Sequence, residues 1–213
     1  MNILSKYQEM LLNLNHIDSN SIILDIGANV GDIADLLFKK FNSNIICYEP
    51  NISCCKYMIN KFKNNPKIKV FNFAVSNFTG TSFLYFHKKA KNIFDYNQRS
   101  TLKPQKDGID INKKISVKCL DIKTILSEHK KIDLIKLDVE GSEYEIMPKI
   151  IENKEKVEMV ICETHGNPEG KKIPSADGSK LVIKNQVWVN DHKKLINKLK
   201  SLNLYENWFY EWY

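Results

Sequence analysis

The sequence predicts an α/β fold in which a mostly parallel sheet carries helices on both faces. Ile22 and Ile23 open a short β-branched run that leads into a turn with two glycines, Gly27 and Gly31, and then into a helical stretch. Further strand-like apolar runs alternate with amphipathic stretches along the chain. Alternation of this kind is typical of parallel sheets built from βα units.

Each element rests on a local pattern. Helices are expected where apolar residues recur every three or four positions, over residues 1–20, 32–41, 52–62, 122–128, 143–152 and 192–202. Strands are expected in β-branched or aromatic runs, over residues 44–48, 68–75, 81–87, 115–120, 133–137, 157–162, 187–189 and 204–213. Asp121 is a plausible helix N-cap, and Pro148 should kink or shorten its helix. Residues 81–87 and 115–120 are expected to pair antiparallel.

Two polar stretches, residues 88–114 and 167–184, show little periodicity. They are too long to be plain connections in a compact domain, so we expect them to be functional or mobile. The chain of 213 residues is otherwise expected to form one domain over residues 1–213, because no linker or internal repeat divides it.

Composition limits the class of protein. The formal net charge is +7, which favours acidic or phosphorylated partners, including nucleic acid, although the lysines are spread along the chain. No apolar run is long enough to span a membrane. Lys6, Gln8 and Glu9 interrupt the apolar core that a signal peptide needs, so we expect none here. The five cysteines form no Cys-x-x-Cys pair, so we expect reduced structural thiols and a cytoplasmic location.

The turn over residues 25–31, Asp-Ile-Gly-Ala-Asn-Val-Gly, has the form of a nucleotide-binding device. Glycine permits a sharp turn and close approach of a ligand, and the following helix start offers free N–H groups. Glu49 ends the next strand, where a carboxylate can accept both hydroxyls of a ribose. The dinucleotide pattern Gly-x-Gly-x-x-Gly is absent, which disfavours an NAD oxidoreductase.

A set of motifs spread over about residues 21–165 resembles the FkbM family of S-adenosylmethionine (SAM) methyltransferases. The motifs are residues 25–31, Tyr-Glu-Pro-Asn at 48–51, Ala-Val-Ser at 74–76 with Gly80, and Ile-Lys-Leu-Asp-Val-Glu-Gly-Ser-Glu at 135–143. The resemblance implies a Rossmann-like class I methyltransferase fold, with a mostly parallel seven-stranded sheet that ends in an antiparallel C-terminal hairpin. It also implies SAM as methyl donor, S-adenosylhomocysteine (SAH) as product, and a hydroxyl on a sugar, glycan or small molecule as acceptor.

In this reading one SAM molecule spans the carboxyl ends of the strands. The expected cofactor-binding residues are Asp25, Gly27, Ala28, Asn29, Gly31, Glu49, Pro50, Ala74, Val75 and Asp138. Glu49 would hold the ribose, Asp25 would meet the ammonium group directly or through water, and residues 72–76 would flank the adenine. The stretches 88–114 and 167–184 would shape the acceptor side, where Arg-Ser-Thr-Leu at 99–102 resembles a Ser-Ser-Leu stretch of the family or is an ordinary loop.

Methyl transfer to a hydroxyl benefits from a base. The candidates are Asp138, Glu140, Glu163 and His165, and Asp138 is favoured because it is a carboxylate at the tip of a buried strand. Its alternative roles are capping the next helix or orienting SAM. The sequence assigns no metal site. Asp138, Glu163 and His165 together suit a divalent cation, but spacing alone cannot establish one.

Two other functions stay open. An RNA ribose 2'-O-methyltransferase fits the basic charge and Lys136, but its Lys-Asp-Lys-Glu set cannot be assembled from these strands. A SAM-binding protein without catalysis has no need of Asp138, Glu140 and Glu143. The acceptor, the methylated position and the oligomeric state do not follow from the sequence.

Overall fold

The computed structural model describes residues 14–90, 99–165, 172–174, 181–183, 188–205 and 208–212. Most of the helix expected over residues 1–20 lies outside these ranges, and its last part, residues 14–20, forms turns instead. Leu14 and Ile17 are nonetheless buried against the sheet, so this segment packs on the core without being helical.

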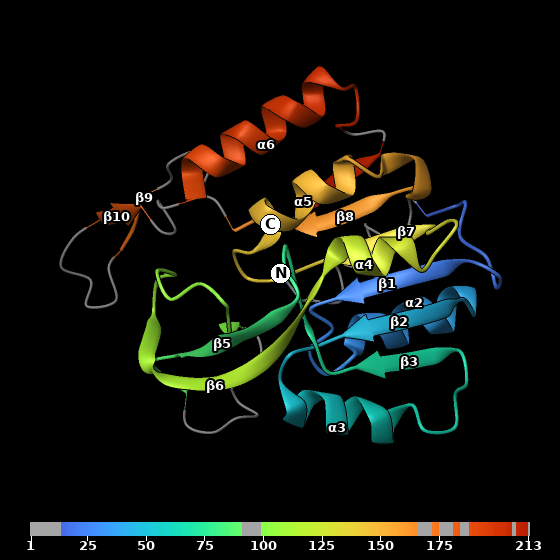
Figure 1. The fold of residues 1–213 in the computed structure, drawn as a ribbon, viewed down its shortest axis with the longest axis horizontal. Coiled ribbons are helices and arrows are strands. Elements are labelled where there is room, and N and C mark those ends of the chain that lie inside the picture. Colours follow the sequence, from blue (N-terminus) through green and yellow to red (C-terminus); the bar gives the residue numbers. More distant parts are fainter. Residues whose placement is uncertain are drawn as a thin grey trace.

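Six parallel strands form the central sheet of the described residues (Figure 1). Their order is β11-β8-β7-β1-β2-β3, and every neighbouring pair is parallel. The strands are β1 (Ile22–Ile26), β2 (Asn44–Tyr48), β3 (Ile68–Phe71), β7 (Leu134–Leu137), β8 (Val160–Glu163) and β11 (Phe209–Trp212). The order runs outward in opposite directions from β1 and β7, and ligands of open α/β sheets bind at the carboxyl ends of such a pair.

Helices cover both faces of this sheet. One face carries α2 (Asp32–Phe41) and α3 (Ile52–Lys61); the other carries α4 (Ile122–Ser127), α5 (Glu143–Ile151) and α6 (Val189–Ser201). A short 3-10 turn, η2 (Lys154–Lys156), leads into β8. Side chains of a strand alternate between faces, so Leu24 and Ile26 pack under α4–α6 while Ile23 packs under α2. The α/β fold with helices on both faces is thus confirmed.

A second sheet of three strands lies at the carboxyl edge of the first (Figure 1). It has the order β4-β6-β5, with β4 (Ala74–Ser76), β5 (Gly80–His87) and β6 (Ile109–Asp121). The expected single strand over 68–75 is therefore split into β3 and β4. The split falls at Asn72, whose amide donates to the carbonyls of Glu49 and Pro50, and the chain then turns away to pair with β6.

The expected antiparallel C-terminal hairpin is wrong for the described residues. Instead, β11 runs parallel to β8. The physical reason is the connection: α6 crosses back over the sheet between the two strands, and a helical crossover returns the chain in the parallel direction.

Other expected elements shift in detail. Residues 109–114 belong to β6 rather than to a loop, and Val189 begins α6 rather than forming a strand. Within 167–184, β9 (Lys172–Pro174) and β10 (Leu181–Ile183) form an antiparallel pair, and the rest lies outside the described residues. In α3, Cys54, Cys55 and Met58 are buried, whereas Ile52 and Ile59 are exposed.

All five cysteines are buried free thiols. Burial raises the pKa of the Cys55 thiol to about 12, so this thiol stays protonated at neutral pH. Among the residues that the structure describes, every helix is too short or too polar to cross a bilayer.

Candidate functional site

A cavity of about 310 Å³ lies where β1, β2 and β7 end. The small sheet closes it from the side, through Ala74, Val75 and Leu84. Its other lining residues are Gly27, Ala28, Asn29, Val30, Asp32, Ile33, Tyr48, Glu49, Pro50, Ser100, Thr101, Leu102, Lys136, Asp138, Val139, Glu140, Ser142 and Glu163.

Position 27 requires glycine both because of its backbone conformation and because neighbouring atoms leave no room for a side chain. Its φ is +77°, and a Cβ at this position would lie 1.8 Å from the carbonyl oxygen of Asp138. The N–H groups of Gly27 and Ala28 both donate to the carbonyl of Tyr48. The turn after β1 is therefore locked between the ends of β2 and β7.

Gly31 also has a positive φ, +76°, and does not line the cavity. A Cβ there would lie 2.7 Å from the ring of Phe62, so α3 packs against the N-terminus of α2 only because Gly31 has no side chain. Both glycines of the turn are thus explained by close packing, and Gly27 alone borders the cavity.

Glu49 lines the cavity and is 6% exposed. One carboxylate oxygen accepts the N–H of Asn29 at 2.8 Å, and the other accepts the N–H of Asn51 at 2.8 Å. Burial raises the pKa of Glu49 to about 7, although these two amides favour the charged form. Each oxygen keeps a second lone pair for a hydroxyl donor.

Asp25 is fully buried and is not among the lining residues. Its oxygen Oδ1 lies 3.2 Å from Nζ of Lys136, its register partner on β7. Burial raises the pKa of Asp25, and the Lys136 ammonium acts against this rise. Lys136 also donates to the carbonyl of Gly27 at 2.9 Å. Asp25 thus forms a buried pair with Lys136 under the turn and does not reach the cavity surface, and its expected contact with the cofactor, directly or through water, stays a prediction.

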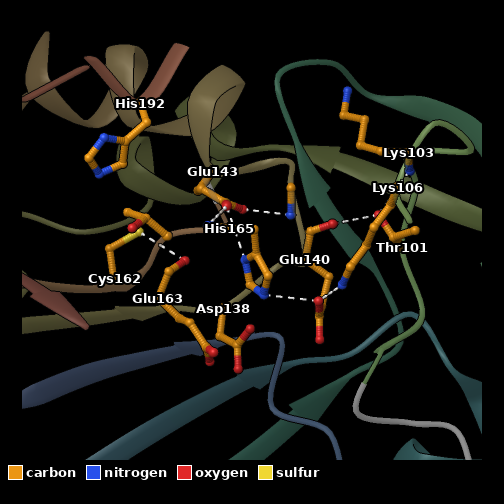
Figure 2. Close-up of polar contacts among 12 residues, drawn as sticks. Thr101, Lys103, Lys106, Asp138, Glu140, Glu143, Cys162, Glu163, His165 and His192 are labelled. Atoms are coloured by element: carbon orange, nitrogen blue, oxygen red, sulfur yellow. Dashed lines mark hydrogen bonds and ion pairs between the residues drawn. The ribbon is translucent and has the colours of Figure 1, made fainter. Parts of the chain in front are cut away.

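Three of the four candidate bases lie together at one end of the cavity. Asp138, Glu140 and Glu163 line it. Asp138 follows β7 and Glu163 ends β8, and the last register pair of these strands, Leu137 and Cys162, places the two carboxylates side by side. Figure 2 shows both beneath the ring of His165.

The buried carboxylate of Glu143 contacts both the backbone and the ring of His165. Oε1 of Glu143 accepts the backbone N–H of His165 at 2.8 Å and lies 3.0 Å from Nδ1 of its ring (Figure 2). Glu143 is 0% exposed, and its other oxygen accepts the N–H of Gly141. Burial lowers the pKa of His165, but the charge and hydrogen bond of Glu143, together with the charge of Asp138, leave the net pKa above its ordinary value. His165 itself does not line the cavity.

The opposite ring nitrogen, Nε2, lies 2.9 Å from Oε2 of Glu140. This same oxygen pairs with the ammonium of Lys106, whose side chain is 6% exposed. Thr101 donates its hydroxyl to the carbonyl of Glu140 at 2.6 Å, and its backbone pairs with that of Tyr85 on β5. Residues 100–102 therefore line the cavity, and the contact with Glu140 joins them to the loop after β7.

Sequence reasoning missed several residues of the site. They are Tyr48, Leu84, Lys106 and Ser142. Glu143 was named only within the motif at 135–143 and as a residue that a non-catalytic protein would not need, and Lys136 was weighed only for an RNA enzyme. The motif at 135–143 contained the signal for Lys136 and Ser142, which line the cavity together with Asp138, Val139 and Glu140. Lys106 gave no signal, since its partner Glu140 is distant in the sequence.

Comparison with known proteins identifies the family. The family model described as "Methyltransferase FkbM domain" matches residues 25–204. No curated protein sequence matches the chain.

The chain is also similar to two solved structures. One is yeast methylglyoxal/isovaleraldehyde reductase Gre2 complexed with NADPH, at 13% identity and a TM-score of 0.44, covering 90% of this chain and 52% of that one. The other is Gre2 from Candida albicans, at 11% identity and a TM-score of 0.43, covering 90% and 55%. This chain spans about half the length of each, and likeness at this level says nothing about its activity. The family match covers most of the chain, and the protein belongs to the FkbM methyltransferase family.

Proposed function

We propose that the protein is a SAM-dependent O-methyltransferase that acts on a hydroxyl of a sugar, glycan or small molecule. The observation that carries this proposal is a single cavity with two different ends. One end holds Glu49, the carboxylate suited to a ribose, and the other holds Asp138, Glu140 and Glu163. A nucleoside donor and a hydroxyl acceptor can therefore meet in one space.

Unpartnered polar atoms support a ligand in this cavity. Asn29 Oδ1 and Ser142 Oγ are both buried atoms without a hydrogen-bond partner in the described structure, and both residues line the cavity. Buried polar groups are normally paired, so such atoms point to a bound polar molecule. Asn29 lies beside Glu49, which accepts its N–H, and Ser142 lies at the start of α5.

The cofactor, when bound, supplies a methyl group on a positively charged sulfur. Glu49 would accept the two ribose hydroxyls, and Ala74 and Val75 would contact the base. The turn at Gly27 allows a ligand to approach the backbone closely. Asp138 would lie beside the sulfur, where its negative charge favours the positive ligand.

The protein residues at the other end would prepare the acceptor. Alignment of the reacting atoms can contribute on the order of 7–11 kcal/mol. A group that takes the hydroxyl proton adds roughly 10²–10⁴-fold in rate. Asp138, Glu140, Glu163 and His165 are the groups that can do so. The net charge of +7 favours an acidic or phosphorylated acceptor, and five unpaired thiols suit a reducing compartment such as the cytoplasm.

The proposal is tested by incubating the purified protein with SAM carrying a labelled methyl group and with a panel of sugars, sugar phosphates, glycans and RNA. We expect SAH to accumulate together with label on a hydroxyl-bearing small molecule or glycan. Asp138→Asn should lower the rate by roughly 10²–10⁴-fold and leave SAH affinity within a few-fold. Label found only on RNA ribose would overturn the acceptor class, and no SAH binding by the wild type would overturn the proposal.

A further inference from the structure

We propose that Asp138, Glu163 and His165 bind one divalent cation of the Mg²⁺/Mn²⁺ class at the acceptor end of the cavity. This inference rests on the proposed function, because it assigns the groups there a shared role in activating the acceptor. The sequence alone placed these residues near one another without showing that their ligand atoms meet.

The geometry of the three side chains suits one ion. A carboxylate oxygen of Asp138, one of Glu163 and a ring nitrogen of His165 all lie within 4.8 Å of one another. Ligand atoms around an octahedral ion at about 2.1 Å are roughly 3–4 Å apart. Small side-chain rotations therefore bring the three atoms to bonding distance, with positions left over for water or substrate.

His165 has the carboxylate partner that metal-binding histidines usually have. Metal ligands of this type usually donate the far ring N–H to a carboxylate or carbonyl, which fixes the tautomer and the ring orientation. Glu143 Oε1 stands at Nδ1 of His165, and Glu143 is itself fully buried and held by two backbone N–H groups. The other ring nitrogen, Nε2, faces Oε2 of Glu140 at 2.9 Å (Figure 2), so an ion would take the place of this contact.

The local charge also favours a cation. Among the described residues, Asp138, Glu140 and Glu163 line this end, and Glu143 contacts His165 beside it. Lys106 pairs with Glu140, and Lys136 lies 3.7 Å from Asp138 while it also pairs with Asp25 under the turn. A divalent ion would favour the ionised carboxylates of Asp138 and Glu163, since like-charged carboxylates side by side repel each other.

Ser142 provides a separate observation in the same cavity. It is 2% exposed, and its hydroxyl oxygen has no hydrogen-bond partner in the described structure. Mg²⁺ and Mn²⁺ keep several of their water ligands when two or three side chains bind them. Such a water would give the Ser142 hydroxyl the partner that the protein does not supply.

The cation would act on the acceptor by drawing electron density from its hydroxyl oxygen, which lowers the pKa of that hydroxyl. The hydroxyl proton would pass to Glu140, which lines the cavity and is outside the ligand set. The acceptor oxygen then forms a bond to the methyl carbon, and the carbon–sulfur bond breaks with its electron pair going to sulfur. The products are the methyl ether and SAH, so atoms and charges balance.

Binding of Mn²⁺ is measured by the loss of the free-ion signal in electron paramagnetic resonance, with SAH present and with Mg²⁺ as competitor. We expect one Mn²⁺ per wild-type chain, displaced by Mg²⁺. Glu163→Gln and Glu143→Gln should each weaken Mn²⁺ binding by about tenfold or more. Glu145→Gln is the matched control: it lies on the same helix as Glu143, but its carboxylate is 42% exposed and pairs with Lys103. Its affinity should stay within twofold of the wild type.

Glu163→Gln is the decisive variant, because Glu163 is part-exposed at a strand end and the change keeps its size. Absence of saturable Mn²⁺ binding by the wild type, or unchanged affinity in Glu163→Gln, would overturn the metal proposal. Full-rate methyl transfer in excess chelator would also overturn it while leaving the proposed function intact. Conversely, Mn²⁺ binding that follows the variants in a protein that does not bind SAH would support the metal site and refute the methyltransferase assignment.

Discussion

Binding of SAH should depend on pH through a single buried carboxylate. Glu49 is 6% exposed, and burial raises its pKa from 4.5 to about 7. Only the ionised form can accept a hydrogen bond at every lone pair. The ribose hydroxyls therefore bind best above pH 7, and binding should weaken as pH falls through this value.

The size of the effect follows from the fraction ionised. With a pKa of about 7, roughly nine tenths of Glu49 is ionised at pH 8 and roughly one tenth at pH 6. If only the ionised form binds, SAH affinity falls by up to about tenfold over this range, which is about 1.4 kcal/mol. Bound hydroxyls stabilise the charged form, so the pKa of Glu49 should be lower in the complex.

The test is calorimetry with SAH at pH 6, 7 and 8 on the wild type, Glu49→Gln and the control Asp35→Asn. Asp35 is on α2, pairs with the exposed Lys39 and does not line the cavity. Glu49→Gln should bind weakly at all three pH values, and the control should follow the wild type. Titration of SAH itself affects all three proteins equally. The reasoning is refuted if wild type and Glu49→Gln show the same change in affinity between pH 6 and pH 8.

Two predictions concern stability, and both are checked by thermal unfolding. Gly27→Ala should lower the free energy of unfolding by more than about 2 kcal/mol, or the melting temperature by about 5 °C or more, because the added Cβ meets a carbonyl oxygen at positive φ. Gly80→Ala is its control and should be close to neutral, because the nearest atom to the added Cβ is 3.5 Å away. Glu211→Ala should lower the free energy of unfolding by about 3 kcal/mol, because the buried side chain of Glu211 accepts hydrogen bonds from Thr164 and Tyr205 and pairs with His192. Glu158→Ala is its control: it removes an exposed ion pair with Lys131 and should change the free energy of unfolding by less than about 1 kcal/mol. Equal melting temperatures within either pair would contradict the packing or the network described.

Much of the fold could be predicted because its signals are local. The run at Ile22, the two glycines and the helix from Asp32 are adjacent in sequence, and the structure confirms them as β1, a turn and α2. The direction of β11 could not be predicted in this way. It depends on where α6 crosses the sheet, which is a long-range property that the aromatic pattern of residues 204–213 does not contain.

The candidate site also combines features that local sequence predicts with features that depend on long-range contacts. The position of Glu49 at a strand tip followed from its motif, but its two backbone partners depend on how β1 and α3 sit around it. The contact of Asp25 with the cofactor stays a prediction, but the pairing of Asp25 with Lys136 could not be predicted from the sequence. That outcome depends on the register of β1 against β7, two strands far apart in the chain. Local sequence gives the residue types of such a site, and tertiary pairing decides which of them face the cavity.

The most direct test of the central claim is a crystal structure of the protein with SAH. We predict that the ligand lies in the cavity at the ends of β1, β2 and β7, with both ribose hydroxyls about 3 Å from the Glu49 carboxylate and the sulfur facing Asp138. A ligand bound elsewhere, or in the cavity with its ribose away from Glu49, would contradict the claim.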